Sequence, residues 1–593
     1  MSRRFGLLAT LALVASTLLA HPTLSQASTT PHASPAAEAF GPHYSKTYSV
    51  QQFIRMKDGV DLGATITFPS RTGSAPAPGR FPVVLDLTPY GRDGECGCDS
   101  AAYLASYGFV FAVVDVRGTG GSGGNLNANY FSPRQARDGY EVVQYLGTRR
   151  WSNGKVGMSG GSYLGIMQYL VAEQQPSHLA AIAPNESLAD LYSDAAYPGG
   201  ILSLFFDTQY LAVQGAPGLA TPNTSPQMLP GTIGGKLSQA TGRSVALDYL
   251  SHNTDDHFYR ARSPITHASR IKVPVYVLDG WHDAFEAGNL RMFEALQDRK
   301  APTFVHIGNC THKGCGGVFD PLGSPDPDDL ALMQVRFFQR YLMGLPVPKP
   351  APVRVYVQKL NRYVDGAAWP LPSTRFTSWH LNDGYLSTRP AARSTEHYLA
   401  NPTAGLSMSL DQQGTVAITP YVPLDQRLED NQGLTWRTPV LAKAMTINGP
   451  AAMHLVAASS ATDTDWFVKI SDVEPGGTER IVAEGQLRAS MRKPAHVSTR
   501  HEPVQSLRKP HPITPGRFVR YQIAIAPTAY RFAAGHRLQI RLTSYNLPNA
   551  LPATFHIDVD DPGATVINPL LPATNTVRIG RGGTTLTLPI SSR

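Results

Sequence analysis

Apolar and polar positions along residues 44–183 form short apolar runs separated by amphipathic stretches. The runs at 81–87 and 108–115 lack polar alternation, which is typical of strands that are covered on both faces of a sheet. A short strand follows over 156–159, and helices are predicted over 138–146 and 163–173. Strands that alternate with helices in this way predict an α/β fold with a mostly parallel sheet.

The strand pattern fades between residues 188 and 263, where aromatic residues stand in helical or irregular context: Tyr192, Tyr197, Phe205, Phe206 and Tyr210. This stretch is predicted to be a helical cap inserted into the α/β domain. Strands resume over 273–278 and 303–307 with a helix over 287–296, and a long amphipathic helix is predicted over 328–342. Three acidic residues stand at its start: Asp326, Asp328 and Asp329. Capping of this helix and interaction with its dipole explain them better than a cation site does.

Residues 346–352 are rich in proline, and beyond them helical patterns nearly vanish. Alternating strands are predicted at 353–357, 452–457 and 538–542, which indicates an all-β sandwich or jelly roll. The predicted organisation is therefore an α/β domain (45–187 and 264–345), a helical cap (188–263) and a β-domain (350–593).

The N-terminus has the features of an export signal. Arg3 and Arg4 precede an apolar run over 5–20, and small residues at 25–27 suit a cleavage site. The run is short for a membrane span, so cleavage after Ala27 is favoured over an uncleaved anchor. We therefore expect a signal peptide over 1–27, a secreted or periplasmic protein, and no membrane association after cleavage.

Composition narrows the choice of partners. The 593 residues are 42% hydrophobic and 16% charged, as in folded globular domains, and the net charge of +8 is scattered without a basic block. A nucleic-acid site is therefore not expected. The four cysteines of an exported chain favour disulfides, and their spacings do not fit a common zinc site: Cys96, Cys98, Cys310 and Cys315. We expect no metal and no cofactor.

Two serines in the segment Val-Gly-Met-Ser-Gly-Gly-Ser-Tyr-Leu-Gly, residues 156–165, are candidate nucleophiles. A nucleophile elbow needs a strand, one strained turn, and a helix that starts at once. Two glycines follow Ser159 and are poor helix starters, whereas Tyr163 and an apolar run follow Ser162. The local chemistry therefore favours Ser162, although Ser159 fits the G-x-S-x-G pattern, and a structural role for both serines is the alternative.

These residues also resemble a known family. The stretch 151–165, with its G-x-S-Y-x-G, is similar to the nucleophile region of the cocaine esterase and X-Pro dipeptidyl-peptidase family of α/β-hydrolases. The resemblance continues in the D-x-R-G-x-G-x-S-x-G stretch at 115–124, in 255–264, and in Trp-Pro-Leu-Pro at 369–372. It implies that Ser162 is the nucleophile and that the β-domain is a galactose-binding-like jelly roll.

An acid and a base are expected after later strands, because α/β-hydrolases carry the order Ser, acid, His. The stretch after the 273–278 strand resembles the family's G-W-x-D, which makes Asp283 the acid, with Asp279 as the rival. His312 occupies the family's histidine position after the 303–307 strand, although Asn309 and Cys310 depart from the usual Pro and Trp.

Donors for the oxyanion are expected from the backbone N–H of Tyr163 and, by the resemblance, from the hydroxyl of Tyr90. A buried aromatic role is the alternative for Tyr90. Substrate contacts are expected from residues that flank the acid, namely Phe285, His282 and Trp281. Relatives that bind an α-amino acyl group carry a carboxylate cluster after the acid, whereas Ala284 and Phe285 stand here and only Glu286 lies beyond.

The predicted function is an exported serine hydrolase that cleaves esters or amides of an apolar acyl group through an acyl-enzyme. Its substrate would be a small ester, an amide or a short peptide. The alternatives are an X-Pro dipeptidyl-peptidase, a β-lactam or amino-acid-ester acylase, and a non-catalytic carbohydrate-binding protein. Homo-oligomerisation and disulfide pairing, either local or between the 96–98 and 310–315 loops, stay open.

Overall fold

A computed structural model describes residues 40–92, 98–126, 129–203, 206, 210–211, 245–312, 328–400, 433–546, 550–551, 553–556, 566–569 and 572–591. The signal peptide predicted over 1–27 lies outside these residues. Within the described ranges, the longest apolar helices fall short of what a membrane crossing would need.

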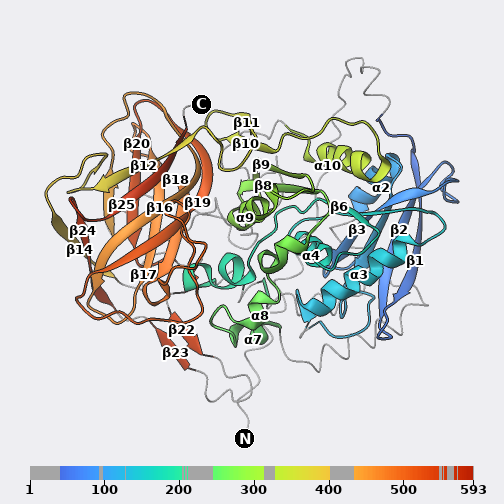
Figure 1. Ribbon diagram of the computed structural model, residues 1–593, viewed down its shortest axis with the longest axis horizontal. Helices are drawn as coiled ribbons and strands as arrows, with labels where there is room; N and C mark the ends of the chain where they lie inside the picture. The colour runs from blue at the N-terminus through green and yellow to red at the C-terminus, as the bar shows by residue number, and fades with distance from the viewer. Residues whose placement is uncertain are drawn as a thin grey trace, which may run out of the picture. The chain divides into compact units, whose positions relative to one another are not determined.

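The N-terminal half forms a ten-stranded sheet in the order β1-β2-β4-β3-β5-β6-β8-β9-β10-β11 (Figure 1). Strands β4, β3, β5, β6, β8, β9 and β10 run parallel, and the antiparallel pairs lie at the two edges. The strands are β1 (Lys46–Arg55), β2 (Asp61–Ser70), β3 (Phe81–Thr88), β4 (Val110–Asp115), β5 (Ser152–Met158), β6 (Leu179–Ile182), β8 (Val275–His282), β9 (Thr303–Thr311), β10 (Val353–Val357) and β11 (Arg362–Gly366).

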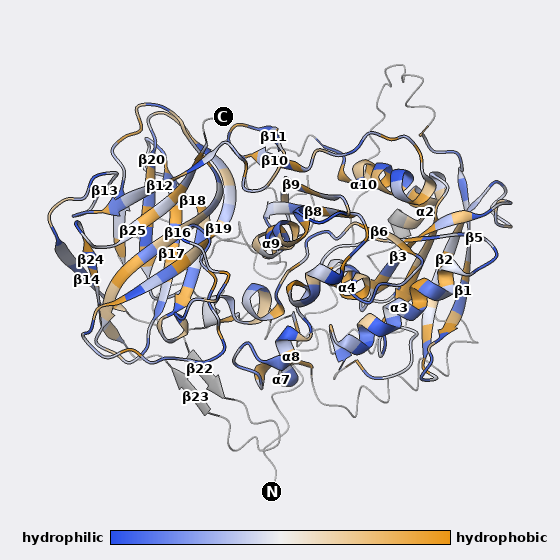
Figure 2. Cartoon of the chain, viewed as in Figure 1, coloured by the Kyte–Doolittle hydropathy of each residue, from blue (hydrophilic) through white to orange (hydrophobic). Residues whose placement is uncertain are grey.

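Helices cover both faces of this sheet, as the buried strands predicted. Alternate residues of β3 point to opposite faces: Val83 and Leu85 join the apolar cluster of one face, and Val84 joins that of the other. The first face is covered by α3 (Pro133–Gly147), α4 (Tyr163–Ala172) and α9 (Glu286–Gln297), and the second by α2 (Cys98–Ser106) and α10 (Leu330–Phe338). Figure 2 shows polar and apolar residues alternating along the amphipathic α3. Every residue of α4 is buried.

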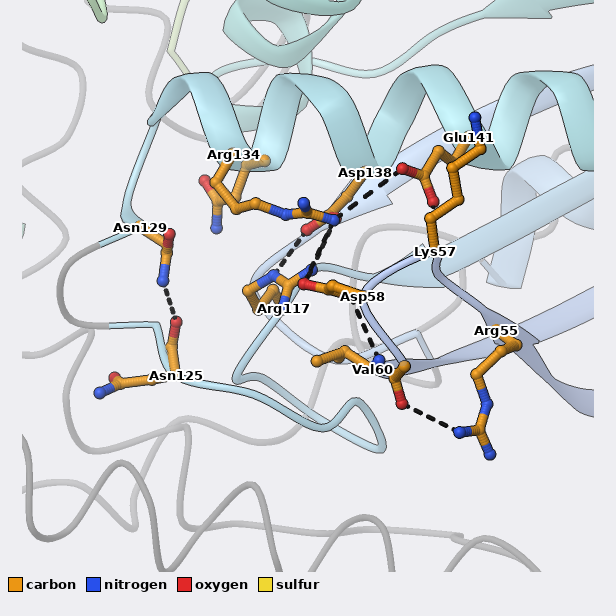
Figure 3. A network of polar contacts seen from close by, with 12 residues as sticks. Arg55, Lys57, Asp58, Val60, Arg117, Asn125, Asn129, Arg134, Asp138 and Glu141 are labelled. Carbon is orange, nitrogen blue, oxygen red and sulfur yellow. Dashed lines mark hydrogen bonds and ion pairs between the residues drawn. The ribbon is translucent and has the colours of Figure 1, made fainter.

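An ion-pair network ties the loop after β4 to α3 (Figure 3). Arg117 donates to both carboxylate oxygens of Asp138, at 2.8 and 2.7 Å, and also contacts Asp58 at 2.9 Å. Arg134, one turn before Asp138 on α3, contacts the same carboxylate at 2.7 Å. Arg117, the arginine of the D-x-R-G stretch, therefore links the loop after β4 to α3.

The described part of the predicted cap consists of short elements. They are η2 (Tyr192–Ala196), η3 (Pro198–Gly200), β7 (Leu202–Ser203), α7 (Val245–Leu250) and α8 (His257–Arg260), followed by η6 (Pro264–Arg270). Aromatic contacts connect them, such as the stacked rings of Tyr192 and Tyr197 and the edge-to-face rings of Tyr249 and Tyr259. The predicted cap residue Phe205 lies outside the described residues.

The C-terminal part is all-β, as predicted. A seven-stranded antiparallel sheet contains β12 (Thr374–Leu381), β13 (Leu386–Ser387), β14 (Ser394–Ala400), β16 (Met445–Ser459), β19 (Val519–Phe532), β24 (Ala573–Ile579) and β25 (Thr585–Ser591). A four-stranded sheet contains β15 (Leu434–Arg437), β17 (Asp465–Val473), β18 (Glu479–Arg488) and β20 (Arg537–Thr543). Two small pairs, β7 with β21 (Ala550–Leu551) and β22 (Ala553–His556) with β23 (Val566–Pro569), lie apart from them.

The strand at 353–357 was assigned to the wrong sheet by its alternating pattern. It is β10, and it pairs in parallel with β9 through Val353 opposite Val305, so it belongs to the α/β sheet. The hairpin partner β11 forms the edge. An alternating pattern of apolar and polar residues indicates that one face of a strand is less buried than the other, but it does not indicate which sheet the strand joins.

The helix predicted over 328–342 is divided, and its cap is one residue later than its predicted start. Asp329 is the N-cap of α10 and accepts from the Leu332 N–H at 2.9 Å. A π-helical segment, η7 (Gln339–Met343), continues α10. Asp328 instead accepts from the Arg354 guanidinium at 2.7 Å, which is consistent with a structural role for these acidic residues.

Candidate active site

The turn between β5 and α4 has the geometry of a nucleophile elbow. Ser162 has φ 58° and ψ −123° and immediately precedes the first residue of α4. This positive φ is unusual for a residue with a side chain and persists only when the surrounding structure fixes it. Close packing does so here, because a Cβ on Gly160 would lie 2.6 Å from Leu164 and one on Gly165 would lie 2.6 Å from the Asn185 carbonyl oxygen.

Ser159 precedes Ser162 by three residues, and its side chain contacts strand β3. Its hydroxyl donates to Asp86 Oδ1 of β3 at 2.5 Å, and its N–H donates to the Leu85 carbonyl at 3.1 Å. Both side chains are buried. Burial raises the pKa of Asp86 to about 7, against the opposing effect of the Ser159 hydroxyl. Ser159 therefore has a structural partner.

The Asp86→Asn variant should become more stable relative to the wild type as pH rises. Because the pKa of Asp86 is raised to about 7 in the folded state, the native protein binds this proton more tightly than the unfolded chain. The stabilisation that the wild-type protein gains from this proton is fully present below the pKa of Asp86 in the unfolded chain, about 4. It is lost as pH rises through the pKa of Asp86 in the folded protein. Urea unfolding at pH values across this window measures the difference. A difference between the two proteins that stays constant with pH would contradict the assignment.

Asp283 and His312 follow adjacent parallel strands, so both reach the edge of the sheet where Ser162 lies. Strand β8 ends at His282, one residue before Asp283, and β9 ends at Thr311, one residue before His312. His312 Nε2 is 2.9 Å from Ser162 Oγ, and His312 Nδ1 is hydrogen-bonded to Asp283 Oδ2. The structure therefore joins the three predicted residues in one chain of hydrogen bonds.

The acid is held from its other side. Asp283 Oδ1 accepts from the Phe285 N–H at 2.6 Å, and the Phe285 ring stands edge-to-face against His312 with centroids 5.4 Å apart. The rival Asp279 lies inside β8, where it accepts from the Gly280 N–H and from Asn289 at 2.7 and 2.9 Å. Burial holds the pKa of Asp279 well above its usual range. Asp283 is thus the carboxylate that contacts the histidine.

The two tyrosines expected near the oxyanion pack against each other. The rings of Tyr90 and Tyr163 are edge-to-face with centroids 6.3 Å apart, and Tyr163 is the first residue of α4. The Tyr90 and Tyr210 hydroxyls are 2.9 Å apart, and Tyr210 is also hydrogen-bonded to Tyr130 at 2.5 Å. A residue of the predicted cap therefore contacts a predicted oxyanion donor.

Of the predicted substrate contacts, Phe285 lies at the triad, whereas Trp281 and His282 are held by the scaffold. The Trp281 indole N–H donates to the Tyr356 carbonyl of β10 at 2.6 Å. His282 Nε2 lies 3.3 Å from Asn309 Oδ1. Both side chains are buried, which fits a structural role.

The predicted disulfides stay a prediction. Cys310 is buried near the end of β9, two residues before His312, and Cys98 begins α2. Cys96 and Cys315 lie outside the described residues.

Two family models match the chain. Residues 58–314 match the model of the X-Pro dipeptidyl-peptidase (S15 family), and residues 347–570 match that of the X-Pro dipeptidyl-peptidase C-terminal non-catalytic domain. The chain belongs to the cocaine esterase and X-Pro dipeptidyl-peptidase family. As a member of this family it is a serine hydrolase.

Family relatives cover most of the chain. Cocaine esterase of Rhodococcus sp. (strain MB1 Bresler) is 27% identical over 552 residues, covering 84% of this chain and 92% of that protein. Among solved structures, a CocE/NonD family hydrolase from Staphylococcus aureus has a TM-score of 0.70 at 21% identity, covering 91% of this chain and 93% of that one. An α-amino acid ester hydrolase has a TM-score of 0.71 at 22% identity, covering 96% and 100%. This chain therefore shares its fold with both structures.

One residue near Ser162, Asp283 and His312 was missed by the sequence analysis. Glu186 follows β6, the neighbour of β8, and its carboxylate, that of Asp283 and a ring nitrogen of His312 all lie within 4.8 Å of one another. Both nitrogens of His312 are already engaged by Ser162 and Asp283. A signal was available, because residues after adjacent parallel strands meet at one edge, but the four-residue β6 was not recognised.

A cavity of about 820 Å³ lies beside the acid. Asp283 and Phe285 line it, as do apolar residues from the predicted cap and from η6, such as Phe206 and Ile265. Its wall also carries carboxyl groups, among them Glu286 and Glu294. Burial and the neighbouring Glu502 raise the pKa of Glu294 to about 9. The cavity can therefore hold a partly apolar group next to the residues that hold His312.

Proposed function

We propose that this serine hydrolase cleaves esters or amides of a mainly apolar acyl group through an acyl-enzyme on Ser162. The observation that carries the proposal is the hydrogen-bonded series from Ser162 Oγ to His312 and on to Asp283. A serine hydroxyl is a weak nucleophile at neutral pH, and an adjacent base that is oriented by a carboxylate activates it.

In the proposed reaction, His312 Nε2 accepts the Ser162 proton while Oγ attacks the substrate carbonyl carbon. The imidazolium is stabilised by Asp283, which stays ionised. His312 then gives the proton to the leaving alcohol or amine as the bond to the carbonyl carbon breaks, and the acyl group remains on Oγ. Water enters, loses a proton to His312 and hydrolyses the acyl-enzyme, and the proton returns to Ser162.

The proposed oxyanion donors are the backbone N–H of Tyr163 and the hydroxyl of Tyr90. Support comes from the position of Tyr163 directly after Ser162 at the start of a helix, and from the packing of Tyr90 against it. Each such donor is worth about 3–4 kcal/mol of transition-state stabilisation in comparable sites. The contact between Tyr90 and Tyr210 supports a role for the proposed helical cap in holding the donor in place.

A substrate panel tests this proposal. The purified protein is assayed on p-nitrophenyl esters of graded acyl length, on matching anilides and on X-Pro anilides, with the Ser162→Ala variant as the blank. Turnover of apolar esters or amides that is lost in the variant supports the proposal. Preferential turnover of X-Pro anilides would replace the proposed substrate class with that of a dipeptidyl-peptidase.

The Phe285→Ala variant should change the acyl preference of the enzyme. The Phe285 ring lies against His312 and lines the cavity beside Asp283, so its removal opens space next to the base. We expect kcat/KM to fall about tenfold for short acyl chains and to fall less, or rise, for long ones, since one pocket contact is worth about 1–3 kcal/mol. The ratio of kcat/KM between hexanoyl and acetyl esters measures this. A uniform decrease for all chain lengths would contradict a specificity role.

A second candidate is an amino-acyl hydrolase, and Glu286 favours it. Glu286 lines the cavity, its side chain is buried, and its Oε1 has no hydrogen-bond partner among the described residues. A carboxyl group in that position could accept a hydrogen bond from a substrate ammonium. Matched esters with a free and an acetylated α-amino group separate the two candidates, because only an amino-acyl hydrolase would prefer the free amine.

We also propose that the protein is exported after cleavage at Ala27, that its β-domain is a galactose-binding-like jelly roll, and that its cysteines form disulfides. The N-terminal pattern supports export, and the four cysteines support disulfides. N-terminal sequencing of the protein from culture medium or periplasm tests export. Non-reducing peptide mapping of the same material decides whether Cys310 pairs within its own loop or with the 96–98 loop.

A further inference from the structure

Residues 185 and 186, which follow β6, are hydrogen-bonded to the nucleophile elbow on one side and to β8, the strand that precedes Asp283, on the other. On one side the Ser162 N–H donates to the Asn185 carbonyl at 3.0 Å. On the other side the Glu186 N–H donates to the Leu278 carbonyl of β8, also at 3.0 Å. Glu186 is therefore held at the junction of the two strands that deliver Ser162 and Asp283.

The backbone at Glu186, like that at Ser162, has a positive φ. Its φ of 47° lies in the left-handed region, where a residue with a side chain costs about 1–3 kcal/mol of strain. The conformation directs the side chain to the elbow: a Cβ on Gly161, next to Ser162, would lie 3.1 Å from Glu186 Oε2. Strain that is kept at such a place is a reason to look for a function.

Glu186 is buried, and ionisable groups surround it. His312, Asp283 and the Asn185 amide interact with its carboxyl group, and Asp279 of β8 interacts with it from the strand beside it. Burial raises the pKa of Glu186 to about 8; the His312 cation opposes this shift, and the Asp283 charge adds to it. Glu186 thus holds a proton in the resting site at neutral pH, and it ionises more readily when Asp283 carries no charge.

We propose that Glu186 is a second positioning carboxyl for His312, which orients the imidazole together with Asp283 and takes over from it when the Asp283 carboxylate is lost. This inference rests on the proposed hydrolase function. An oxygen of Glu186 lies within 4.8 Å of a ring nitrogen of His312, and to replace Asp283 it has to reach hydrogen-bond distance, about 3 Å, from Nδ1. The carboxylate would then hold the tautomer that leaves Nε2 free to accept the Ser162 proton.

The test is a double-mutant cycle on one p-nitrophenyl ester. Loss of a triad aspartate to asparagine typically costs about 10⁴-fold in kcat. With Glu186 in place, Asp283→Asn should cost only about 10²- to 10³-fold, and adding Glu186→Gln should cost at least a further tenfold. In the wild-type background Glu186→Gln should cost about two- to fivefold. In addition, the activity of Asp283→Asn should rise with pH through a transition that is absent from the double variant.

Glu173→Gln is the matched control. Glu173 is another buried glutamate, at the end of α4, and its pKa is raised by burial to about 9. Combined with Asp283→Asn, it should leave the pH transition in place. Equal factors for Glu186→Gln in both backgrounds, or a double variant as active as Asp283→Asn, would overturn the inference. A Ser162→Ala variant with wild-type activity would instead overturn the proposed function, so the two failures are distinguishable.

Discussion

The Ser162→Ala variant is expected to lose hydrolytic activity by about 10⁶-fold, the scale of loss when a serine nucleophile is removed. Ser162 Oγ is 2.9 Å from His312 Nε2, and its strained turn starts α4. Alanine keeps the turn and removes only the oxygen that would carry the acyl group. The expected readouts are kcat on a p-nitrophenyl ester and labelling by a fluorophosphonate, with the adduct located by peptide mapping.

Ser159→Ala is the matched control, because it removes a hydroxyl three residues away. The Ser159 hydroxyl donates to the buried Asp86 carboxyl group. Its loss leaves a buried acceptor without this donor, which costs about 1–3 kcal/mol of stability. We expect this variant to unfold at lower urea but to react with the probe. An adduct on Ser159 in the wild-type protein would refute the assignment of the nucleophile.

The Asp115→Ala variant is expected to lose about 3–5 kcal/mol of stability, the usual cost of breaking a buried ion pair by removing one partner. Asp115 accepts from the Arg92 backbone N–H at 2.6 Å and from its guanidinium at 2.5 Å, and both side chains are almost fully buried. It also accepts from the Gly121 N–H at 2.7 Å. Its loss releases the loop after β3 that carries Tyr90.

Thermal unfolding measures this effect, with an expected fall in Tm of roughly 5 °C. The matched control is Arg55→Ala, which breaks the ion pair between Arg55 and Asp61. The Arg55 side chain is 69% exposed, and exposed pairs contribute roughly 0–1 kcal/mol. A similar small loss for Asp115→Ala would show that the buried pair is not what holds the loop. Activity should fall along with Tm, because Tyr90 is a proposed oxyanion donor.

The sequence was most informative where local chemistry and chain order agree. Ser162 was preferred because a helix can start after it, and the structure begins α4 at Tyr163. Asp283 and His312 followed from strand ends, chain order and the resemblance to the family's G-W-x-D and histidine positions, and the structure joins them to Ser162. Both strands run further than predicted, so Asp279 is part of β8 and Cys310 is part of β9.

Features that depend on long-range pairing could not be predicted in this way. The pattern of β10 was correct for a strand but could not show that its neighbour is β9, because pairing partners are set by tertiary packing. Glu186 was missed for a related reason. Its place beside His312 comes from the pairing of β6 with β5 and β8, and the four-residue β6 was not recognised from its short apolar pattern.

The pairing of β10 with β9 also decides where this enzyme can be shortened. A truncation at the proline-rich stretch 346–352 would remove β10 and β11 and turn β9 into an unpaired edge, which is prone to aggregation. The Trp281 indole would lose its acceptor on Tyr356 at the same time. Any fragment that keeps the α/β sheet intact must therefore extend at least to Gly366, the last residue of β11, and cannot stop at the apparent linker.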